Sequence, residues 1–172
     1  MTELPSGPKS SEAKRHDFEA NLQSYVEGLG LPNNDTMLNQ VKADAGRFME
    51  LSFGGKRQMT SEECYEATAV LQQYASCIHR EAQRQEAIAA WSSEQVSKTI
   101  VENLKAQSAY GTKERWICAV AENDAAVRLD QFRIRAESYA KSLAYLPMRI
   151  EKIAESYARL GDAKRKQERN YS

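Results

Sequence analysis

The chain has 172 residues and equal numbers of basic and acidic side chains, 24 of each, so its formal net charge is zero. This length suits one domain, or one domain with a disordered arm. Gly and Pro number only 8 and 4, and aromatic residues make up 8% of the chain. That composition favours long helices with narrow apolar stripes, which often bury those stripes against partner chains.

Two common classes of protein are excluded by simple patterns. No run approaches the roughly 18 apolar residues that a membrane span needs, and residues 2–5 do not form the apolar region of a signal peptide. The three cysteines, Cys64, Cys77 and Cys118, lack CxxC spacing and lie in stretches of helical periodicity. We therefore expect reduced thiols packed in the core of a cytoplasmic protein.

The N-terminal part predicts a disordered arm and two short helices. Residues 1–16 combine Pro, Gly and Ser with scattered charge and offer little to bury. Residues 17–56 repeat apolar side chains at helical spacing in two stretches, separated by Gly30 and Pro32. Gly54-Gly55 is expected to end the second helix and to form a mobile connector.

A long helix is predicted to begin at Thr60. Thr60 and Glu63 have the spacing of a capping box, in which each side chain accepts from the other's backbone N–H. No Gly or Pro interrupts residues 60–110, so a helix of about fifty residues, about 75 Å long, is possible. The expected weak point is Ser92-Ser93 or the polar stretch before it.

A turn about Gly111 is predicted to reverse the chain. Gly111 suits a left-handed cap and Thr112 suits the N-cap of the next helix. Pro147 is expected to kink that helix or to start a new one, and Gly161 to end the final apolar stripe before a basic tail over 166–172. The predicted fold is therefore all-α, with a long helical hairpin and a C-terminal helix over 60–165, packed in a homo-oligomer.

The sequence offers no constellation for catalysis. The two histidines are His16, in the predicted arm, and His79, which lies two residues from Cys77 and so on a different helix face. There is no Glu-x-x-His pair of the di-iron type and no glycine-rich phosphate loop. We predict no catalytic residue, no metal site and no cofactor, and hence a protein that is not an enzyme.

Cations and aromatic side chains gather near the predicted turn, as single-stranded nucleic acids require. They are Lys98, Lys105, Tyr110, Lys113 and Arg115, with Trp116 next to them. Residues 112–172 also carry 13 basic and 9 acidic side chains, with a cluster at 164–169. The alternatives are that the aromatic groups belong to the core and that the cations are merely solvated or complement a helix dipole.

Short motifs resemble the UvsY family, the recombination mediators of T-even-type phages. The resemblance covers roughly residues 60–165. It is carried by Tyr65-Glu66-Ala67, Tyr74, Leu104-Lys105-Ala106, Glu114, Ala121, Asp124, Asp130, Tyr139, Ile150 and Ile153.

The resemblance implies a closed homo-oligomer that binds single-stranded DNA and helps a phage recombinase to replace the single-strand-binding protein, in the host cytoplasm. Lys105 matches a family lysine, whereas Gln107 stands where the family has arginine, which weakens the local charge. The oligomer contacts would come from the C-terminal helix, through Ile150, Ile153, Tyr157 and Leu160. The alternative prediction is a non-catalytic assembly protein: a scaffold, an adaptor or a virion component.

Overall fold

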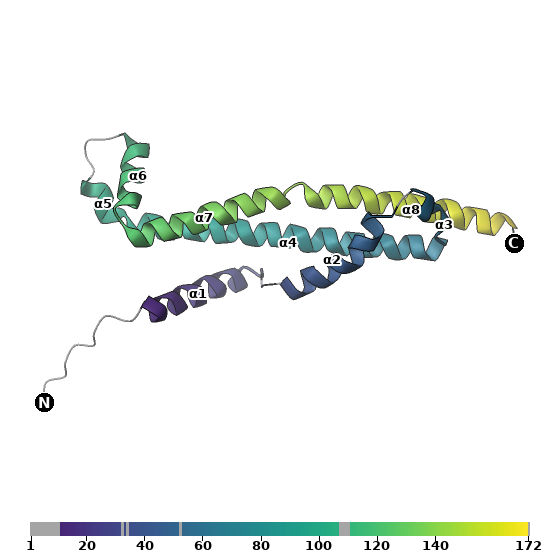
Figure 1. The fold of residues 1–172 in the computed structure, drawn as a ribbon, viewed down its shortest axis with the longest axis horizontal. Helices are drawn as coiled ribbons and strands as arrows, with labels where there is room; N and C mark the ends of the chain where they lie inside the picture. Colours follow the sequence, from purple (N-terminus) through teal and green to yellow (C-terminus); the bar gives the residue numbers. More distant parts are fainter. Residues whose placement is uncertain (1–10, 32, 34, 52, 107–110, 172) are drawn as a thin grey trace, which may run out of the picture. The chain divides into compact units, whose positions relative to one another are not determined.

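The computed structural model describes residues 11–31, 33, 35–51, 53–106 and 111–171. Within these ranges every regular element is an α-helix, which confirms the predicted all-α class (Figure 1). In chain order the helices are α1 (Ser11–Gly28), α2 (Asp35–Met49), α3 (Phe53–Gln58), α4 (Ser61–Thr99), α5 (Val101–Ala106), α6 (Thr112–Ala121), α7 (Asp124–Leu143) and α8 (Leu146–Tyr171).

The helices form two compact units, each assembled from two separate stretches of chain. The first unit comprises Met1–Pro32 and Ala87–Arg133, and the second comprises Asn33–Glu86 and Ile134–Ser172. Helices α4 and α7 each contribute to both units. Each unit therefore combines residues that lie far apart in the sequence.

The core of the second unit lies between α2, the first part of α4, the end of α7 and α8. Buried side chains recur every three or four residues on the long helices, which places them on one face of each. They are Ala45 and Phe48 of α2, Cys64, Ala67, Leu71, Ala75, Ile78 and Ala82 of α4, and Leu143, Ile150, Ala154 and Tyr157 of α7 and α8. Many of these residues are small, which suits the close approach of helices.

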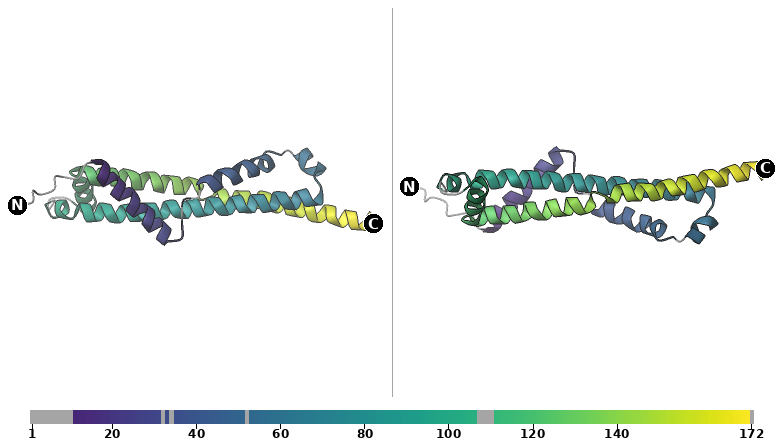
Figure 2. Two further views of the ribbon diagram at one scale, coloured as in Figure 1. Left: turned by 90° about the horizontal axis from the view of Figure 1, so that it is seen from below. Right: turned by 90° about the horizontal axis from the view of Figure 1, so that it is seen from above.

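Helices α4 and α8 run side by side and antiparallel in this unit (Figure 2). Three side-chain hydrogen bonds show the direction, because the residue numbers rise along α4 as they fall along α8. The Ser61 hydroxyl donates to Glu168 at 3.1 Å, and the Tyr65 hydroxyl donates to Asp162 at 2.7 Å. The Thr68 hydroxyl donates to the carbonyl of Ala154 at 3.3 Å.

Gly161 lies where these two helices approach closely. A Cβ atom at this position would lie 3.2 Å from Cβ of Cys64 and 3.3 Å from the ring of Tyr65. Gly161 was expected to end the helical stripe, but α8 continues through it to Tyr171. The glycine allows α4 and α8 to approach closely and does not end the helix.

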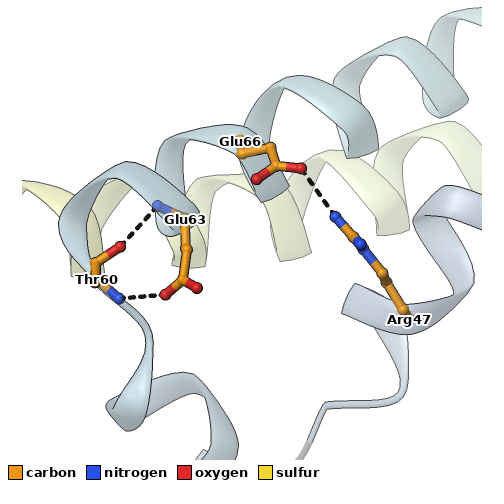
Figure 3. Close-up of polar contacts among 4 residues, drawn as sticks. All are labelled: Arg47, Thr60, Glu63 and Glu66. Carbon is orange, nitrogen blue, oxygen red and sulfur yellow. Dashed lines mark hydrogen bonds and ion pairs between the residues drawn. The ribbon is translucent and has the colours of Figure 1, made fainter.

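The start of α4 has the predicted capping box. The Thr60 N–H donates to Oε2 of Glu63 at 2.6 Å, and the Glu63 N–H donates to Oγ1 of Thr60 at 3.2 Å (Figure 3). Nearby, Nη2 of Arg47 in α2 donates to Oε1 of Glu66 in α4 at 2.9 Å. The prediction is confirmed, because the local sequence alone supplies both partners.

The first unit contains two apolar clusters. One joins the end of α4 to α6 and α7 and is built on Val96, Ile100, Ala119, Val120 and Ala126, with Leu104, Trp116, Val127 and Leu129 packed against it. The other attaches α1. In this cluster Trp91 of α4 lies close to two rings of α1. Its ring centroid is 5.1 Å from that of Phe18 and 6.4 Å from that of Tyr25. Aromatic pairs at such distances add to the stability gained from burial.

Two predicted helix boundaries differ from the structure in the N-terminal part. Helix α1 begins at Ser11, within the stretch predicted to be a disordered arm, and residues 1–10 lie outside the described part. Gly54 and Gly55 belong to α3 and not to a connector. Glycine permits a break in a helix without requiring one.

The predicted long helix of residues 60–110 ends earlier than expected. It does not break at Ser92-Ser93, because Ser92 is fully buried and its hydroxyl donates to the carbonyl of Ile88 at 2.8 Å. Helix α4 instead ends at Thr99, and α5 begins at Val101. A serine that bonds to the preceding turn is compatible with a helix interior.

The turn residues also differ in detail from the prediction. Gly111 has φ −62° and ψ 163°, so it is extended and not left-handed, and it precedes α6 as its N-cap in place of Thr112. Helices α6 and α7 are separate because Oδ1 of Asn123 accepts from the amides of Ala125 and Ala126 and so caps α7. Pro147 lies in the first turn of α8, in agreement with a new helix there.

Candidate nucleic-acid interface

The candidate interface lies in the first unit, where α5 and α6 meet. Lys98, in the last turn of α4, forms an ion pair with Glu94 at 2.7 Å, and Lys105 of α5 pairs with Glu102 at 2.9 Å. The two lysine side chains are 62% and 67% exposed. Exposed pairs of this kind contribute about 0–1 kcal/mol, so a phosphate group can displace either carboxylate at little cost.

Lys113 is the third exposed cation at this end and lies in the first turn of α6. It lines a pocket of about 440 Å³ together with Leu104, Thr112 and Trp116. We call this the α5–α6 pocket. Its size falls within the range of about 300–1,000 Å³ typical of ligand sites. The lining thus includes one aromatic and one basic residue, the kinds of side chain that stack on bases and contact phosphates.

Trp116 has a second role, because its half-buried ring also packs against the cluster of Val96 and Ile100. The core therefore fixes its position. A rigid aromatic group loses little conformational entropy when a base stacks on it.

Arg115 performs a structural task in the described structure. Its Nη2 donates to the carbonyl of Leu104 at 3.0 Å and so ties α6 to the end of α5. Its Nε is buried and has no hydrogen-bond partner among the described residues. Of the five residues predicted from the sequence, Lys98, Lys105, Lys113 and Arg115 all lie in the first unit. Tyr110 lies outside the described residues, as does Gln107.

Acidic groups reduce the positive charge of this end. Besides Glu94 and Glu102, the carboxylate of Glu114 folds back over the start of α6, because its Oε2 lies 2.6 Å from the place a Cβ of Gly111 would take. An acidic group there complements the helix dipole. The positive charge at this end is therefore that of a few exposed lysines, and not a strong positive field.

The predicted basic tail continues α8 in the second unit. Lys164 is half-buried and its Nζ donates to the carbonyl of Arg57 at 2.8 Å, so it holds α8 against the end of α3. Lys152, Arg159 and Lys166 are exposed and follow one another at intervals of seven residues, which places them on one line of the helix. The spacing is present in the sequence, but it places the three cations on one face only because α8 continues through Gly161.

The residues predicted for oligomer contacts pack into the core of their own chain. Ile150 and Tyr157 are 3% and 0% exposed, and Ile153 and Leu160 are partly buried against the same core. The Tyr157 hydroxyl donates to the carbonyl of Phe48 at 2.6 Å. A side chain already enclosed by its own subunit has little surface left for a partner, so self-association would need other residues.

Among the described residues of the second unit, four side chains have pKa values raised by identifiable causes. The hydrogen bond from its hydroxyl to Asp162 raises the pKa of Tyr65. Burial raises the pKa of the Cys64 thiol and of the Tyr157 and Tyr74 hydroxyls. A reactive cysteine requires a lowered pKa, so Cys64 stays an inert thiol. In the described part of the chain, no group of three His, Cys, Asp or Glu side chains is placed to hold a metal ion. Nor does any described helix combine the length and the apolar character needed to cross a membrane.

Comparisons with known proteins leave the resemblance as a prediction. No protein-family model, no curated protein and no solved structure matches this chain. The proposals that follow therefore rest on the residues and their geometry.

Proposed function

We propose that this chain is a non-enzymatic helical protein that binds single-stranded DNA at the α5–α6 end. The observation that supports this function is the α5–α6 pocket, where Trp116 and Lys113 share one opening. Lys98 and Lys105 are exposed cations of the same unit. A base stacked on Trp116 would leave its phosphates within the reach of flexible lysine side chains.

The finer architecture belongs to the same proposal. We propose that the long helices form a hairpin whose turn carries the DNA site, and that several copies associate into a homo-oligomer. One copy has few cations to offer, and an oligomer that presents several such sites to one strand gains affinity by multivalency. In this arrangement the protein would act as a recombination mediator, helping a phage recombinase to replace the single-strand-binding protein in the host cytoplasm.

A tryptophan titration tests the DNA site directly. The chain has two tryptophans, so Trp91→Phe leaves Trp116 as the only indole reporter. Adding an oligothymidylate should quench and shift its fluorescence, because stacking changes the environment of the ring. If the emission stays unchanged while the oligonucleotide binds, the pocket is not the site.

Anisotropy of a labelled oligonucleotide measures the affinity and its dependence on salt. Three lysine contacts predict a slope of log K against log salt of about −2. Lys113→Ala should weaken binding several-fold, whereas Lys42→Ala, an equal change at an exposed position of α2, should leave it unaltered. Absence of any binding at low salt would refute the DNA-binding function.

The mediator role requires a separate assay. A recombinase added to DNA covered by single-strand-binding protein shows a lag before ATP hydrolysis begins, and this chain should shorten that lag. A normal DNA affinity without any change in the lag would retain the binding site and reject the mediator role.

The alternative function, an assembly protein, is supported by a different observation. Several large apolar side chains are exposed, including Ile117 at 53% and Tyr145 at 73%. Exposed apolar side chains mark a protein-binding surface where they gather in one patch, as Tyr145, Leu146 and Met148 do along the sequence. Oligomers that form equally well with and without DNA, together with no DNA binding, would favour this alternative.

A further inference from the structure

The junction between α7 and α8 carries apolar side chains that the second unit does not bury. Tyr145 is 73% exposed, Met148 50% and Leu146 37%. On the other side of the junction, Leu143 and Ile150 belong to the core. The junction, which joins α7 to α8 in Figure 1, therefore carries both buried and exposed apolar side chains.

Opposite charges flank this exposed surface at equal distances along the chain. Lys141 comes seven residues before Met148 and Glu155 comes seven residues after it, and both are exposed. Seven residues make two helical turns, so Met148 and Glu155 share one face of α8. Lys141 lies on α7, before the turn at residues 144–145, and marks the other end of the surface. An occupant that matches these two charges offers an acid at the Lys141 end, a base at the Glu155 end and an apolar centre.

A second copy of this chain, placed antiparallel, meets all three requirements. We propose that two copies pair through this surface about a twofold axis that passes near Met148. A residue that precedes Met148 by a given number of positions then faces the residue that follows Met148 by the same number in the other copy. Lys141 faces the partner's Glu155, Glu155 faces the partner's Lys141, and the Tyr145 and Met148 side chains fill the centre.

Charge selects the antiparallel orientation. A parallel pair in register would set Lys141 against Lys141 and Glu155 against Glu155, and like charges in contact disfavour an arrangement. Glu155 has an ion pair with Arg159 in its own chain, at 3.6 Å, but the two side chains are 64% and 82% exposed. Such a pair is weak and yields readily to a better-placed partner.

The small size of the apolar centre predicts a weak dimer. Three exposed side chains per copy contribute less area than a standard interface, so we expect a weak dimer that dissociates on dilution. The pairing deepens the proposed self-association, and it does not depend on DNA binding. A failure of the DNA titration and a failure of this pairing are therefore separate results.

Charge reversal combined with analytical ultracentrifugation tests the pairing. Lys141→Glu and Glu155→Lys should each weaken dimerisation by about tenfold or more, because each sets like charges face to face twice. The double variant should return to within a few-fold of the original affinity. Arg80→Glu, the same change of charge at an exposed position of α4, is the matched control and should have no effect. A sample that stays monomeric at about 1 mM, or a double variant that fails to recover, overturns the proposal.

Cross-linking tests the orientation with one introduced, exposed cysteine per copy. The background carries Cys118→Ser, since Cys64 and Cys77 are buried and Cys118 is only partly so. Met148→Cys should form a disulfide-linked dimer on mild oxidation. Lys141→Cys alone should not, because the two equivalent positions would be about 21 Å apart, while a mixture of Lys141→Cys and Glu155→Cys chains should link to each other. Efficient linkage of Lys141→Cys to itself would show a parallel pair and refute the twofold axis.

Discussion

Removing the hydroxyl of Tyr157 should destabilise the second unit out of proportion to the size of the change. Tyr157 is fully buried, and its hydroxyl donates to the carbonyl of Phe48 at 2.6 Å, joining α8 to α2. The variant Tyr157→Phe keeps the ring, which lies 6.1 Å from the Phe48 ring. It leaves a buried carbonyl without its donor.

The expected loss follows from that unsatisfied carbonyl. Leaving a buried acceptor unpaired costs about 1–3 kcal/mol, which corresponds to a fall in Tm of roughly 2–4 °C for each kcal/mol in a chain of this length. Guanidinium unfolding followed by circular dichroism measures the free energy. Tyr139→Phe is the matched control, because Tyr139 is 46% exposed. Equal stabilities of the Tyr157→Phe variant and the parent would refute the hydrogen-bond argument.

The same residue predicts a dependence on alkaline pH. Burial raises the pKa of Tyr157 above the usual value of 10.0. The unfolded chain therefore releases this proton at a lower pH than the folded chain does. The stabilisation is fully present below pH 10 and is lost as the pH rises through the folded pKa. Tyr157→Phe should lose less stability than the parent between neutral pH and pH 11.

Three further substitutions test helix packing and capping by denaturant unfolding. Gly161→Leu should cost at least about 1–3 kcal/mol by overpacking the contact with Cys64 and Tyr65, and stability equal to the parent would show that the helices are not in close contact there. Thr60→Ala should cost about 1 kcal/mol through loss of the capping box, and Thr60→Ser should retain most of it. Asn123→Ala should cost about as much, because two amides at the start of α7 lose their acceptor; an unchanged stability would mean that water replaces the cap.

Local chemistry made parts of the candidate site predictable. Lys98, Lys105, Lys113 and Arg115 lie close to one turn in the sequence, and the structure places all four in the first unit. What they do there could not be predicted. Arg115 binds the Leu104 carbonyl, and the α5–α6 pocket depends on the packing of Trp116.

Glycine signals were the least reliable local evidence. The sequence suggested breaks at Gly54-Gly55 and Gly161, and both lie within helices. A break in a helix is decided by whether neighbouring segments stabilise the helical backbone, and Gly161 is held by the close approach of α4. The left-handed glycine among the described residues is Gly30, at φ 71°.

The amino-acid sequence by itself determined the all-α class, the capping box at Thr60 and an interruption at Pro147, whether a kink or a new helix. These features depend on residues within a few positions of one another, and their hydrogen bonds and dihedral preferences are local. Only the tertiary structure decided that α4 and α7 each serve two units, that Tyr157 joins α8 to α2, and that Ile150 is already buried. An apolar stripe shows that a helix face will be covered, but the partner that covers it depends on contacts between residues far apart in the chain.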